Sequence, residues 1–342
     1  MESDAAADVT ERYARFAEDA RNRSALYEVW ARGVVADERV RDVIARIPAD
    51  RRQPPLVFAV TRLLGAPEAD FASWAEWIIA HPDALVAECA RRSLQTNEPL
   101  RCAALLPALS LIDGPIALLE VGASAGLCLI PDRYSYRYRG IGGVTTLDPA
   151  GGPSAVVLSS ELTTDDRMPL LRLPEIVWRA GVDVDPLDAS DPDDRRFLTT
   201  LVWPGESGRV KRIEAALDVV AADPPLLVRA DATTDRVLAD LASRAPGDAT
   251  LVVTTPGVLP HIPRGGRVRL AETIAALGAR WITIDPPALH AELAASVRPE
   301  GSPIDPDAWE AFVLALDGVP LASVDPLGAS VAWRPADRRA AP

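Results

Sequence analysis

The spacing of apolar residues divides the chain near residue 114. Before that point, "ERYARFAEDARNRSALYEVWARGVV" (11–35) and "EADFASWAEWIIAHPDALVAECARRSL" (68–94) carry apolar residues at helical intervals, with a break at Pro82. No stretch of residues 8–112 has the pattern of a strand. We therefore expect residues 1–114 to form an N-terminal helical domain, which acts as a lid.

From residue 115 onward, short apolar runs alternate with helical patterns. Such alternation predicts a mostly parallel sheet with helices on both faces. The short turn "DGVP" before the last run predicts an antiparallel hairpin. The runs expected as strands are 116–121, 175–184, 226–230, 250–255, 281–285, 312–318 and 321–325. The helical patterns between them are 209–222, 234–245 and 267–279. We expect an α/β domain with a seven-stranded sheet at 115–333, and a tail at 334–342.

Composition and charge narrow the class of protein. The 342 residues are 48% hydrophobic and 25% charged, as in soluble globular proteins. A net charge of −13 opposes binding to nucleic acid or to an anionic membrane. Cys89, Cys102 and Cys128 lack metal-ligand spacing, so no metal site is expected. The first helix pattern is charged throughout, so no signal segment is expected, and charges and prolines interrupt the most apolar stretch, 102–130. We expect a cytoplasmic protein that acts on a small molecule.

The first expected strand ends in a run of small residues, "LLEVGASAGL" (118–127). Gly122, Ser124 and Gly126 would let the backbone turn sharply into a helix and approach a ligand closely. Such a turn serves nucleotide-type binding at the carboxyl edge of a parallel sheet. It also matches the G-x-S-x-G nucleophile elbow of hydrolases, with Ser124 as the nucleophile.

The hydrolase interpretation also needs an acid and a histidine downstream of the elbow. His261 and His290 are available, and His290 closely follows Asp285. However, an elbow serine normally follows several earlier strands, which also supply the oxyanion-hole loop. Here the segment before the first strand is helical, so nucleotide-type binding is favoured and Ser124 is more simply a small residue in a tight turn.

The pattern E-x-G-x-S-x-G at the first strand resembles the first motif of class I methyltransferases, which bind S-adenosylmethionine (SAM). In "RAGVDVDPLD" (179–188) a carboxylate ends the second strand, where that family binds the ribose hydroxyls. The third strand, in "LLVRADATTDRVLADL" (226–241), ends where the family holds adenine, and "TLVVTTPGVL" (250–259) resembles the fourth strand, whose end faces the reacting centre. The cofactor-binding residues implied are Glu120, Gly122, Ser124, Gly126, Asp183, Asp231, Ala232 and Thr254.

The chain departs from this pattern in two ways. Ser124 replaces the middle glycine, and Asp183 lies further from the turn than the ~20 residues typical of ribose-binding acids. An insertion at about 132–174 must therefore loop out of the sheet. Glu161 is the alternative ribose-binding acid if the second strand is misplaced.

The chain more closely resembles a family of uncharacterised actinobacterial proteins that carry a methyltransferase-like core behind a helical domain. The segments that carry this likeness are "LQTNEPLRCAALLPAL" (94–109), "LLEVGASAGLCLIPDRYSY" (118–136), "RAGVDVDPLDASDPDD" (179–194) and "LVWP" (201–204). Some methyltransferase homologues of this general build close a ring within SAM instead of transferring its methyl group.

Three of the five tyrosines alternate in "DRYSYRY" (132–138). Alternation places Tyr134, Tyr136 and Tyr138 on one side of an extended segment, where they could contact the SAM sulfonium through cation–π attraction. The alternative is a strand whose rings pack on the sheet. Tyr27 is a further candidate to close over the site, with core packing as its alternative.

"QTNEPLR" (95–101) supplies two more candidates. Asn97 and Pro99 are typical of a helix start, but Arg101 in the first turn is disfavoured by the helix dipole. Arg101 could instead bind the carboxylate of SAM. Candidates for a catalytic base are Tyr134, Tyr136 and Glu98.

The function expected from the sequence is that of a SAM-utilising enzyme. Ring closure to azetidine-2-carboxylate or 1-aminocyclopropane-1-carboxylate, with release of methylthioadenosine, is favoured because the conspicuous residues suit SAM itself. The alternatives are a SAM-dependent methyltransferase acting on a small molecule and a non-catalytic SAM-binding protein.

Overall fold

The computed structural model describes residues 2–163, 168–234, 236–289 and 311–334. It forms two compact units, one of Met1–Thr96 with Ser190–Glu214 and the other of Asn97–Ala189 with Ala215–Pro342. The expected tail beyond 334 and His290 lie outside the described residues.

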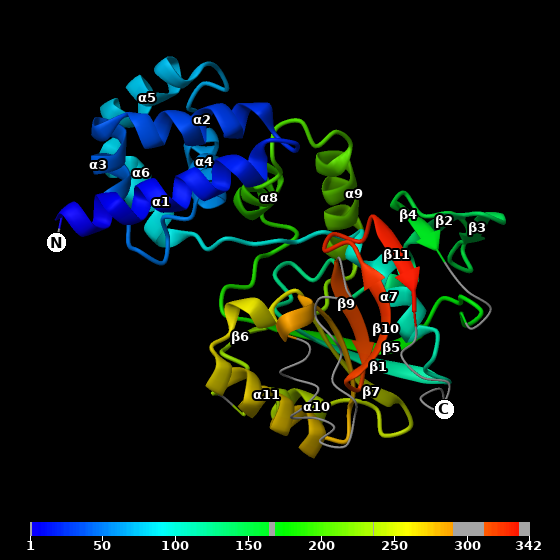
Figure 1. Cartoon of the computed structure of the whole chain (residues 1–342). Helices are drawn as coiled ribbons and strands as arrows, with labels where there is room; N and C mark the ends of the chain where they lie inside the picture. The colour runs from blue at the N-terminus through cyan, green and yellow to red at the C-terminus, as the bar shows by residue number, and fades with distance from the viewer. Residues whose placement is uncertain (1, 164–167, 235, 290–310, 335–342) are drawn as a thin grey trace. The chain divides into compact units, whose positions relative to one another are not determined.

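The first unit is helical. The pattern expected over 11–35 is two helices, separated at Arg21–Ser24, and the break at Pro82 separates two more. Its helices, mostly blue and cyan in Figure 1, are α1 (Glu2–Ala20), α2 (Ala25–Ala36), α3 (Glu38–Ala45), α4 (Pro54–Leu63), α5 (Phe71–Ala80), α6 (Pro82–Arg91) and α8 (Pro192–Thr200). The division between the units falls within α9 (Arg209–Ala222).

An aromatic cluster forms the core of the helical unit. Trp30 and Trp74 stack with ring centroids 4.8 Å apart, and Phe58 meets both rings edge-on. Tyr27 lies 4.9 Å from Phe58 and is fully buried, which is the core-packing alternative given for this residue. Trp203 joins the cluster through Phe16, at 4.9 Å.

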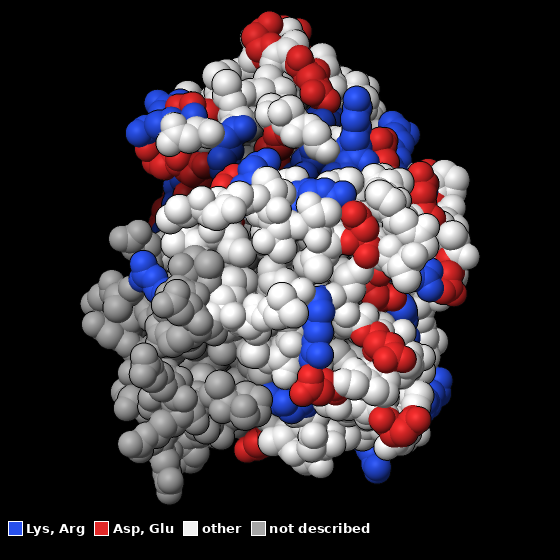
Figure 2. Space-filling view, turned by 90° about the vertical axis from the view of Figure 1, so that its right-hand side faces the viewer, with Lys and Arg blue, Asp and Glu red and all other residues white. Residues whose placement is uncertain are grey.

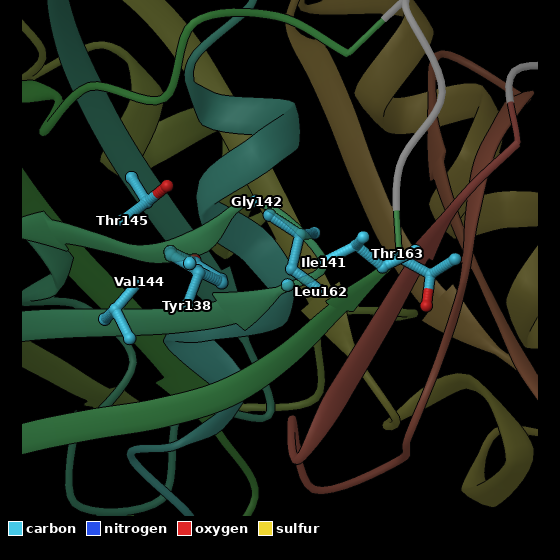
Figure 3. Close-up of a pocket in the computed structure, with 9 residues that line it drawn as sticks. Tyr138, Ile141, Gly142, Val144, Thr145, Leu162 and Thr163 are labelled. Carbon is cyan, nitrogen blue, oxygen red and sulfur yellow. The ribbon is translucent and has the colours of Figure 1, made fainter.

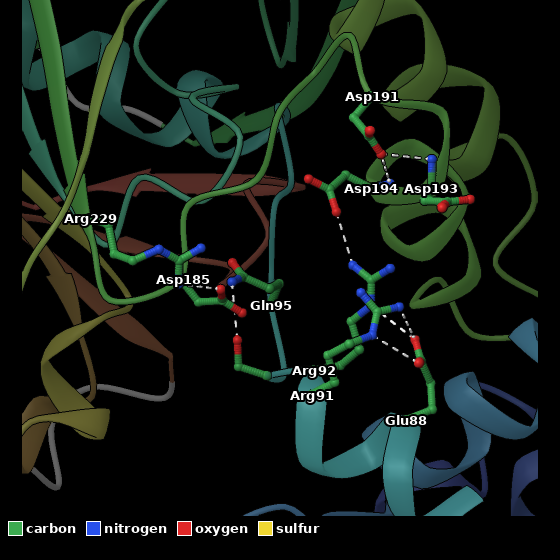
Figure 4. A network of polar contacts seen from close by, with 10 residues as sticks. Glu88, Arg91, Arg92, Gln95, Asp185, Asp191, Asp193, Asp194 and Arg229 are labelled. Atoms are coloured by element: carbon green, nitrogen blue, oxygen red, sulfur yellow. Dashed lines mark hydrogen bonds and ion pairs between the residues drawn. The ribbon is translucent and has the colours of Figure 1, made fainter. Parts of the chain in front are cut away.

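Two arginines hold the segment 190–214 in the helical unit. Arg62 donates to the backbone carbonyls of Thr200 and Val202 at 2.7 and 2.9 Å. Arg92 lies between Glu88 and Asp194, at 3.1 and 2.9 Å (Figure 4). Because side chains far along the chain complete this unit, its bounds could not be read from one continuous helical stretch.

The second unit contains one sheet with helices packed against it. Its strands are β1 (Pro115–Val121), β2 (Ser135–Gly140), β3 (Gly143–Leu147), β4 (Val157–Thr163), β5 (Glu175–Asp183), β6 (Leu226–Arg229), β7 (Thr250–Pro256), β8 (Arg280–Asp285), β9 (Phe312–Leu316), β10 (Val319–Val324) and β11 (Ser330–Trp333). Its helices include α7 (Arg101–Leu109), α10 (Val237–Ala242) and α11 (Arg264–Ala276).

The strands lie in the order β3-β2-β4-β11-β10-β9-β8-β7-β1-β5-β6. The part β6-β5-β1-β7-β8 is parallel throughout. Numbered along the chain, these five strands have the order 3-2-1-4-5, as in doubly wound nucleotide-binding folds. The strand order therefore reverses between β1 and β7.

The sheet has eleven strands among the described residues, so the expectation of seven was wrong. All seven expected strands are present, and β2, β3, β4 and β11 were missed. The insertion at 132–174 does not loop out of the sheet: β2 and β3 form a hairpin, and β2 pairs in parallel with β4. β4 pairs with β11, so the insertion extends the sheet at the edge far from β1 (Figure 1).

The expected hairpin between the last two runs is confirmed. β9 and β10 pair antiparallel, with Leu316 opposite Val319. Asp317 and Gly318 form the two-residue connection with φ of 51° and 75°. Positive φ at both positions matches a type I′ turn, for which Asp-Gly is a preferred sequence.

Strand alternation divides the buried residues of this unit between two faces. Leu119, Val182 and Val253 belong to one apolar cluster, which packs against α10 and α11. Their neighbours Glu120, Asp183 and Thr254 therefore point to the other face. The arrangement places polar side chains at the ends of strands whose remaining residues are core.

Charged side chains of both signs are interleaved on the face in Figure 2. Among the exposed charged residues of the described chain, Arg15 pairs with Glu11 at 3.0 Å and Arg139 with Glu161 at 2.8 Å. Exposed pairs of this kind contribute little to stability. The buried ionisable groups are therefore more informative about stability and about the site.

The close approach of β5 to the loop after β1 gives a test of the fold. A Cβ on Gly181 would lie 2.4 Å from the Cβ of Ala123 and 2.8 Å from Leu227. Gly181→Ala should lower the free energy of unfolding by about 1–3 kcal/mol through overpacking. Gly142→Ala is the matched control, because nothing lies within 4 Å of its added methyl group. Equal urea midpoints for the two variants would contradict this packing.

Candidate active site

The loop after β1 is shaped by close packing. Gly122 and Gly126 have φ of 77° and 78°, in the left-handed region that favours glycine. A Cβ on Gly122 would lie 2.6 Å from Val258, in the loop after β7. The amides of Gly122 and Ala123 both donate to the carbonyl of Val182 at the end of β5. The turn is thus fixed between the ends of β5 and β7.

No α-helix follows this loop. The chain continues from Gly126 to a single 3-10 turn at Pro131–Arg133 and then enters β2. The expectation that the loop turns into a helix was wrong. Pro131 and the tyrosines that follow lead the chain into a strand instead. The backbone N–H groups of a helix N-terminus, which bind phosphate in dinucleotide folds, are therefore missing from this stretch of the described chain.

Asp183 is the last residue of β5, the strand beside β1, and its carboxylate contacts the loop after β1. It accepts hydrogen bonds from the amides of Ser124 and Asp185, both at 2.8 Å. Each carboxylate oxygen keeps a second acceptor position. Glu161, the alternative ribose-binding acid, lies in β4 and pairs with Arg139 at 2.8 Å. The geometry brings Asp183, and not Glu161, to the loop after β1.

Glu120 and Thr254 are buried side by side at the end of β1 and β7. They are register partners on these two parallel strands, and their exposed fractions are 3% and 1%. Glu120 Oε2 and Thr254 Oγ1 have no hydrogen-bond partner among the described residues. Burial raises the pKa of Glu120 well above its usual value, and Cys128 and Asp183 add to the rise.

Arg101 lies beyond the ends of the strands. Its Nη1 donates to the carbonyl of Pro256, the last residue of β7, and its Nε donates to Pro326. A Cβ on Gly257 would lie 3.0 Å from Arg101 Nη2, so this glycine lets the guanidinium approach. The charge of Arg101 acts on Glu120, lowering its pKa against the effect of burial.

Asp285 ends β8 and was not among the residues expected to bind SAM. It is fully buried, and neither of its carboxylate oxygens has a hydrogen-bond partner within the described part of the chain. Burial raises its pKa to about 8, and the charges of Arg101 and Arg267 oppose the rise. The signal in the sequence was the same as for Asp183: an acid directly after an apolar run.

Asp231 and Ala232 follow β6, the strand beyond β5. Asp231 Oδ1 accepts from the amide and hydroxyl of Thr233 at 2.8 and 2.7 Å, and these bonds lower its pKa. Ala232 is buried. Both residues are thus at the carboxyl edge, two strands from β1.

The three tyrosines of 132–138 are packed in the interior. Tyr134, Tyr136 and Tyr138 are at most 1% exposed, and their hydroxyls donate to the carbonyls of Leu127, Pro131 and Ala103. Burial raises the pKa of all three phenols, which keeps them protonated. This geometry matches the packed-strand alternative. A role for them as sulfonium cage or base stays a prediction.

Glu98 is also fully buried. Its Oε1 accepts from the amide of Leu100 at 3.0 Å, and its backbone carbonyl accepts a weak bond from the thiol of Cys128. Neighbouring Asn97 is 8% exposed, and its Nδ2 has no partner in the described chain. This segment therefore lies against the loop after β1, as Arg101 does against the loop after β7.

Ser124 has the backbone of a strained turn. Its φ is 51°, a value unusual for a residue with a side chain, and its Oγ has no hydrogen-bond partner among the described residues. A nucleophile elbow needs a base bonded to that oxygen. Burial, and next the positive charge of Arg101, lower the pKa of His261. A charged neighbour of this histidine is therefore Arg101. The geometry of Ser124 therefore does not favour the hydrolase interpretation.

A separate pocket of about 240 Å³ lies at the tip of the β2–β3 hairpin (Figure 3). Ile141, Val144 and Leu162 line it, together with the glycines of the turn. It contains no charged side chain, which sets it apart from the carboxyl edge of β1 and β7.

One comparison with known proteins assigns the chain to a family. A family model described as "Uncharacterized protein conserved in bacteria (DUF2332)" matches residues 10–333. The chain belongs to the DUF2332 family. The match spans the whole of the site, from Asn97 to Asp285. Neither the curated proteins nor the solved structures gave a match. The description of DUF2332 names no activity.

No described helix of this DUF2332 protein has the length and apolar character needed to cross a membrane.

The buried carboxyl of Asp285 predicts a pH dependence of stability. Its folded pKa of about 8 lies above the ordinary value of 3.8, so the folded state binds the proton more tightly. The resulting stabilisation is complete below about pH 4 and is lost as the pH rises through 8, by at most about 1.4 kcal/mol per pH unit.

Asp285→Asn stays neutral and should not lose this stability. Relative to the wild-type protein, its melting temperature should rise as the pH increases from 5 to 9. A constant difference in melting temperature over this range would show that Asp285 ionises normally.

Proposed function

We propose that this DUF2332 protein binds S-adenosylmethionine and closes a ring within its aminobutyryl chain, with release of methylthioadenosine. The observation that carries the proposal is a set of buried polar groups without hydrogen-bond partners at the ends of β1, β7 and β8. Among the described residues these are Glu120, Ser124, Thr254 and Asp285, and Asn97, in the segment before α7, has another such group. Buried polar groups are nearly always paired, so a set of them at one sheet edge indicates a polar ligand.

The location of this set supports a ligand site. In open α/β sheets, ligands bind outside the carboxyl ends of the strands, where the strand order reverses. Here the order reverses between β1 and β7, whose ends carry Glu120 and Thr254.

The acidic groups at this edge favour a cationic ligand over a phosphate. Glu120, Asp183 and Asp285 bring acidic groups to this edge, and no helix N-terminus follows the loop in the described chain. Dinucleotide sites rely on such an N-terminus for their pyrophosphate. SAM has no phosphate: its sulfonium and ammonium groups suit the acids, and its carboxylate suits Arg101.

The resemblance to methyltransferases assigns the remaining parts of SAM. Asp183 would accept hydrogen bonds from the ribose hydroxyls with the lone pairs that Ser124 and Asp185 leave available. Asp231 and Ala232 would hold the adenine amino group. All of these residues lie along the same edge of β1, β5 and β6.

Ring closure needs positioning and one proton transfer. The amine, or the deprotonated α-carbon, attacks the γ-carbon, and the bond from the γ-carbon to sulfur breaks. The electron pair of that bond stays on sulfur, which becomes the neutral thioether of methylthioadenosine. One proton passes from the amine or the α-carbon to a base. The attacking atom and the γ-carbon must be held near ~3–3.5 Å and in line with the sulfur.

The direct test uses SAM alone. The purified protein should convert SAM to methylthioadenosine and a small-ring amino acid, identified together by mass spectrometry. The ring size names the nucleophile, because the amine gives azetidine-2-carboxylate and the α-carbon gives 1-aminocyclopropane-1-carboxylate. S-adenosylhomocysteine, formed only when a small-molecule acceptor is added, would instead establish methyl transfer.

The ribose assignment gives a second test. Asp183→Asn should weaken SAM binding by about tenfold to a hundredfold, as expected for hydrogen bonds to a charged acceptor. Glu161→Gln is the matched control, because the Glu161 side chain lies on β4 and pairs with Arg139 of β2, away from the loop after β1. Titration calorimetry measures both affinities, and thermal melting checks that the loop at Ser124 remains folded. Equal loss in the two variants would reject the assignment.

A further inference from the structure

Asp285 is the buried acid that the proposed binding of SAM leaves without an assignment. The side chain is 0% exposed, and both carboxylate oxygens lack a hydrogen-bond partner in the part of the chain that the structure describes. Leaving a buried carboxyl group unpaired costs free energy, so a fold alone does not favour an acid here. Groups of this kind gather at functional sites.

The position of Asp285 connects it with Arg101. The amide of Gly257 donates to the carbonyl of Ile284, the residue before Asp285, at 2.9 Å. The guanidinium of Arg101 lies over the same glycine, within 3.0 Å of where a Cβ would be. Gly257 therefore lies between the guanidinium and the end of β8.

Strand alternation gives the direction of the two acids. Glu120 points to the face of β1 opposite the α11 cluster, whereas Trp281 of β8 packs in that cluster. Asp285, four residues after Trp281, lies on the same face as Trp281 and close enough to Arg267 of α11 for its charge to act on it. Arg101 acts on both acids from beyond the strand ends.

We propose that Asp285 receives the α-ammonium group of a ligand whose carboxylate lies on Arg101, so that the site selects a free α-amino acid end. This inference rests on the proposed function, and it makes Asp285 the proton acceptor in ring closure. A cation that binds the carboxylate and an acid that binds the amine are needed together to recognise a zwitterion. A ligand without the amino acid end would gain nothing from either residue.

The proton balance is simple. When the amine attacks, one ammonium proton passes to an Asp285 oxygen, the nitrogen–γ-carbon bond forms, and the γ-carbon–sulfur bond breaks with its electrons on sulfur. When the α-carbon attacks, its proton passes to Asp285 instead. In both cases Asp285 ends protonated and methylthioadenosine leaves neutral.

The groups that face Asp285 set the state in which it meets the ligand. Arg101 from α7 and Arg267 from α11 favour its charged form, while burial favours the neutral form more strongly. His261, beside Arg101, has a lowered pKa and is neutral at pH 7. At pH 7 the free protein therefore carries a proton on Asp285, which an arriving ammonium group would displace.

The experiment compares SAM with methylthioadenosine, which has the same nucleoside but no amino acid end. Titration calorimetry at pH 7, in two buffers of different ionisation enthalpy, gives the affinity and the number of protons released. Wild-type protein should release about one more proton with SAM than with methylthioadenosine. Asp285→Asn should bind SAM about tenfold to a hundredfold more weakly, release about one proton fewer, and bind methylthioadenosine as before.

Glu161→Gln serves as the control variant and should match the wild-type protein in all four measurements. If Asp285→Asn weakens both ligands equally, Asp285 supports the fold and the inference fails. Unchanged SAM affinity and proton release would also overturn it, with the proposed function intact. If the wild-type protein binds neither ligand, the proposed function and the inference fail together. Should Asp285→Asn not fold, equal proton release for the two ligands by wild-type protein is sufficient to reject the inference.

Discussion

The parallel pairing of β1 with both β5 and β7 is the constraint on which the rest of the second unit depends. β1 is the first strand of the sheet along the chain, and β5 and β7 pair with it on opposite sides. The strand order reverses between β1 and β7, and the sheet edge at that point carries the side chains of the candidate site. The tight packing of Gly122 against Val258, and of Gly181 against Ala123, follows from three strand ends meeting there.

Stability and chemistry make opposite demands at this edge. Burial raises the pKa of both Glu120 and Asp285, so their ionisation costs free energy that the fold does not recover. The same environment makes Glu120 and Asp285 responsive to any cation that comes near, because the attraction is little screened away from water. Neutral residues at these positions would give a more stable protein with less capacity to act on a ligand.

The outline of the fold could be read from the sequence because it depends on local patterns. All seven expected strands and the Asp317-Gly318 hairpin form where apolar runs and turn chemistry indicated them. Of the strands in the insertion, β3 could not be predicted, because it is exposed and lacks the buried alternation that marks a strand, whereas a strand at the tyrosines of β2 was given as an alternative. The bounds of the helical unit also escaped prediction, since Arg62 and Arg92 bind groups more than a hundred residues away, the backbone carbonyl of Thr200 and the carboxylate of Asp194.

The candidate site was predictable in part for the same reason. Glu120, Asp183 and Thr254 follow apolar runs and could be named from their order. Asp285 ends an equally clear strand, but its lack of any partner is a property of the packed interior, which no single sequence displays. The tyrosines were conspicuous by spacing alone, and their hydroxyls turn out to satisfy backbone carbonyls.

The pairing of β4 with β11 bears on how the chain is made. Ser330 lies opposite Glu161, so β4, near the middle of the chain, pairs with β11, the last strand along the chain. During synthesis at the ribosome, β2, β3 and β4 would form a small sheet with one unfilled edge until β11 emerges. Exposed edges of this kind invite pairing with other chains, and long-range closure is slow. A nascent chain that stalls before residue 330 would thus be prone to aggregate, although the five parallel strands β1, β5, β6, β7 and β8 are already synthesised.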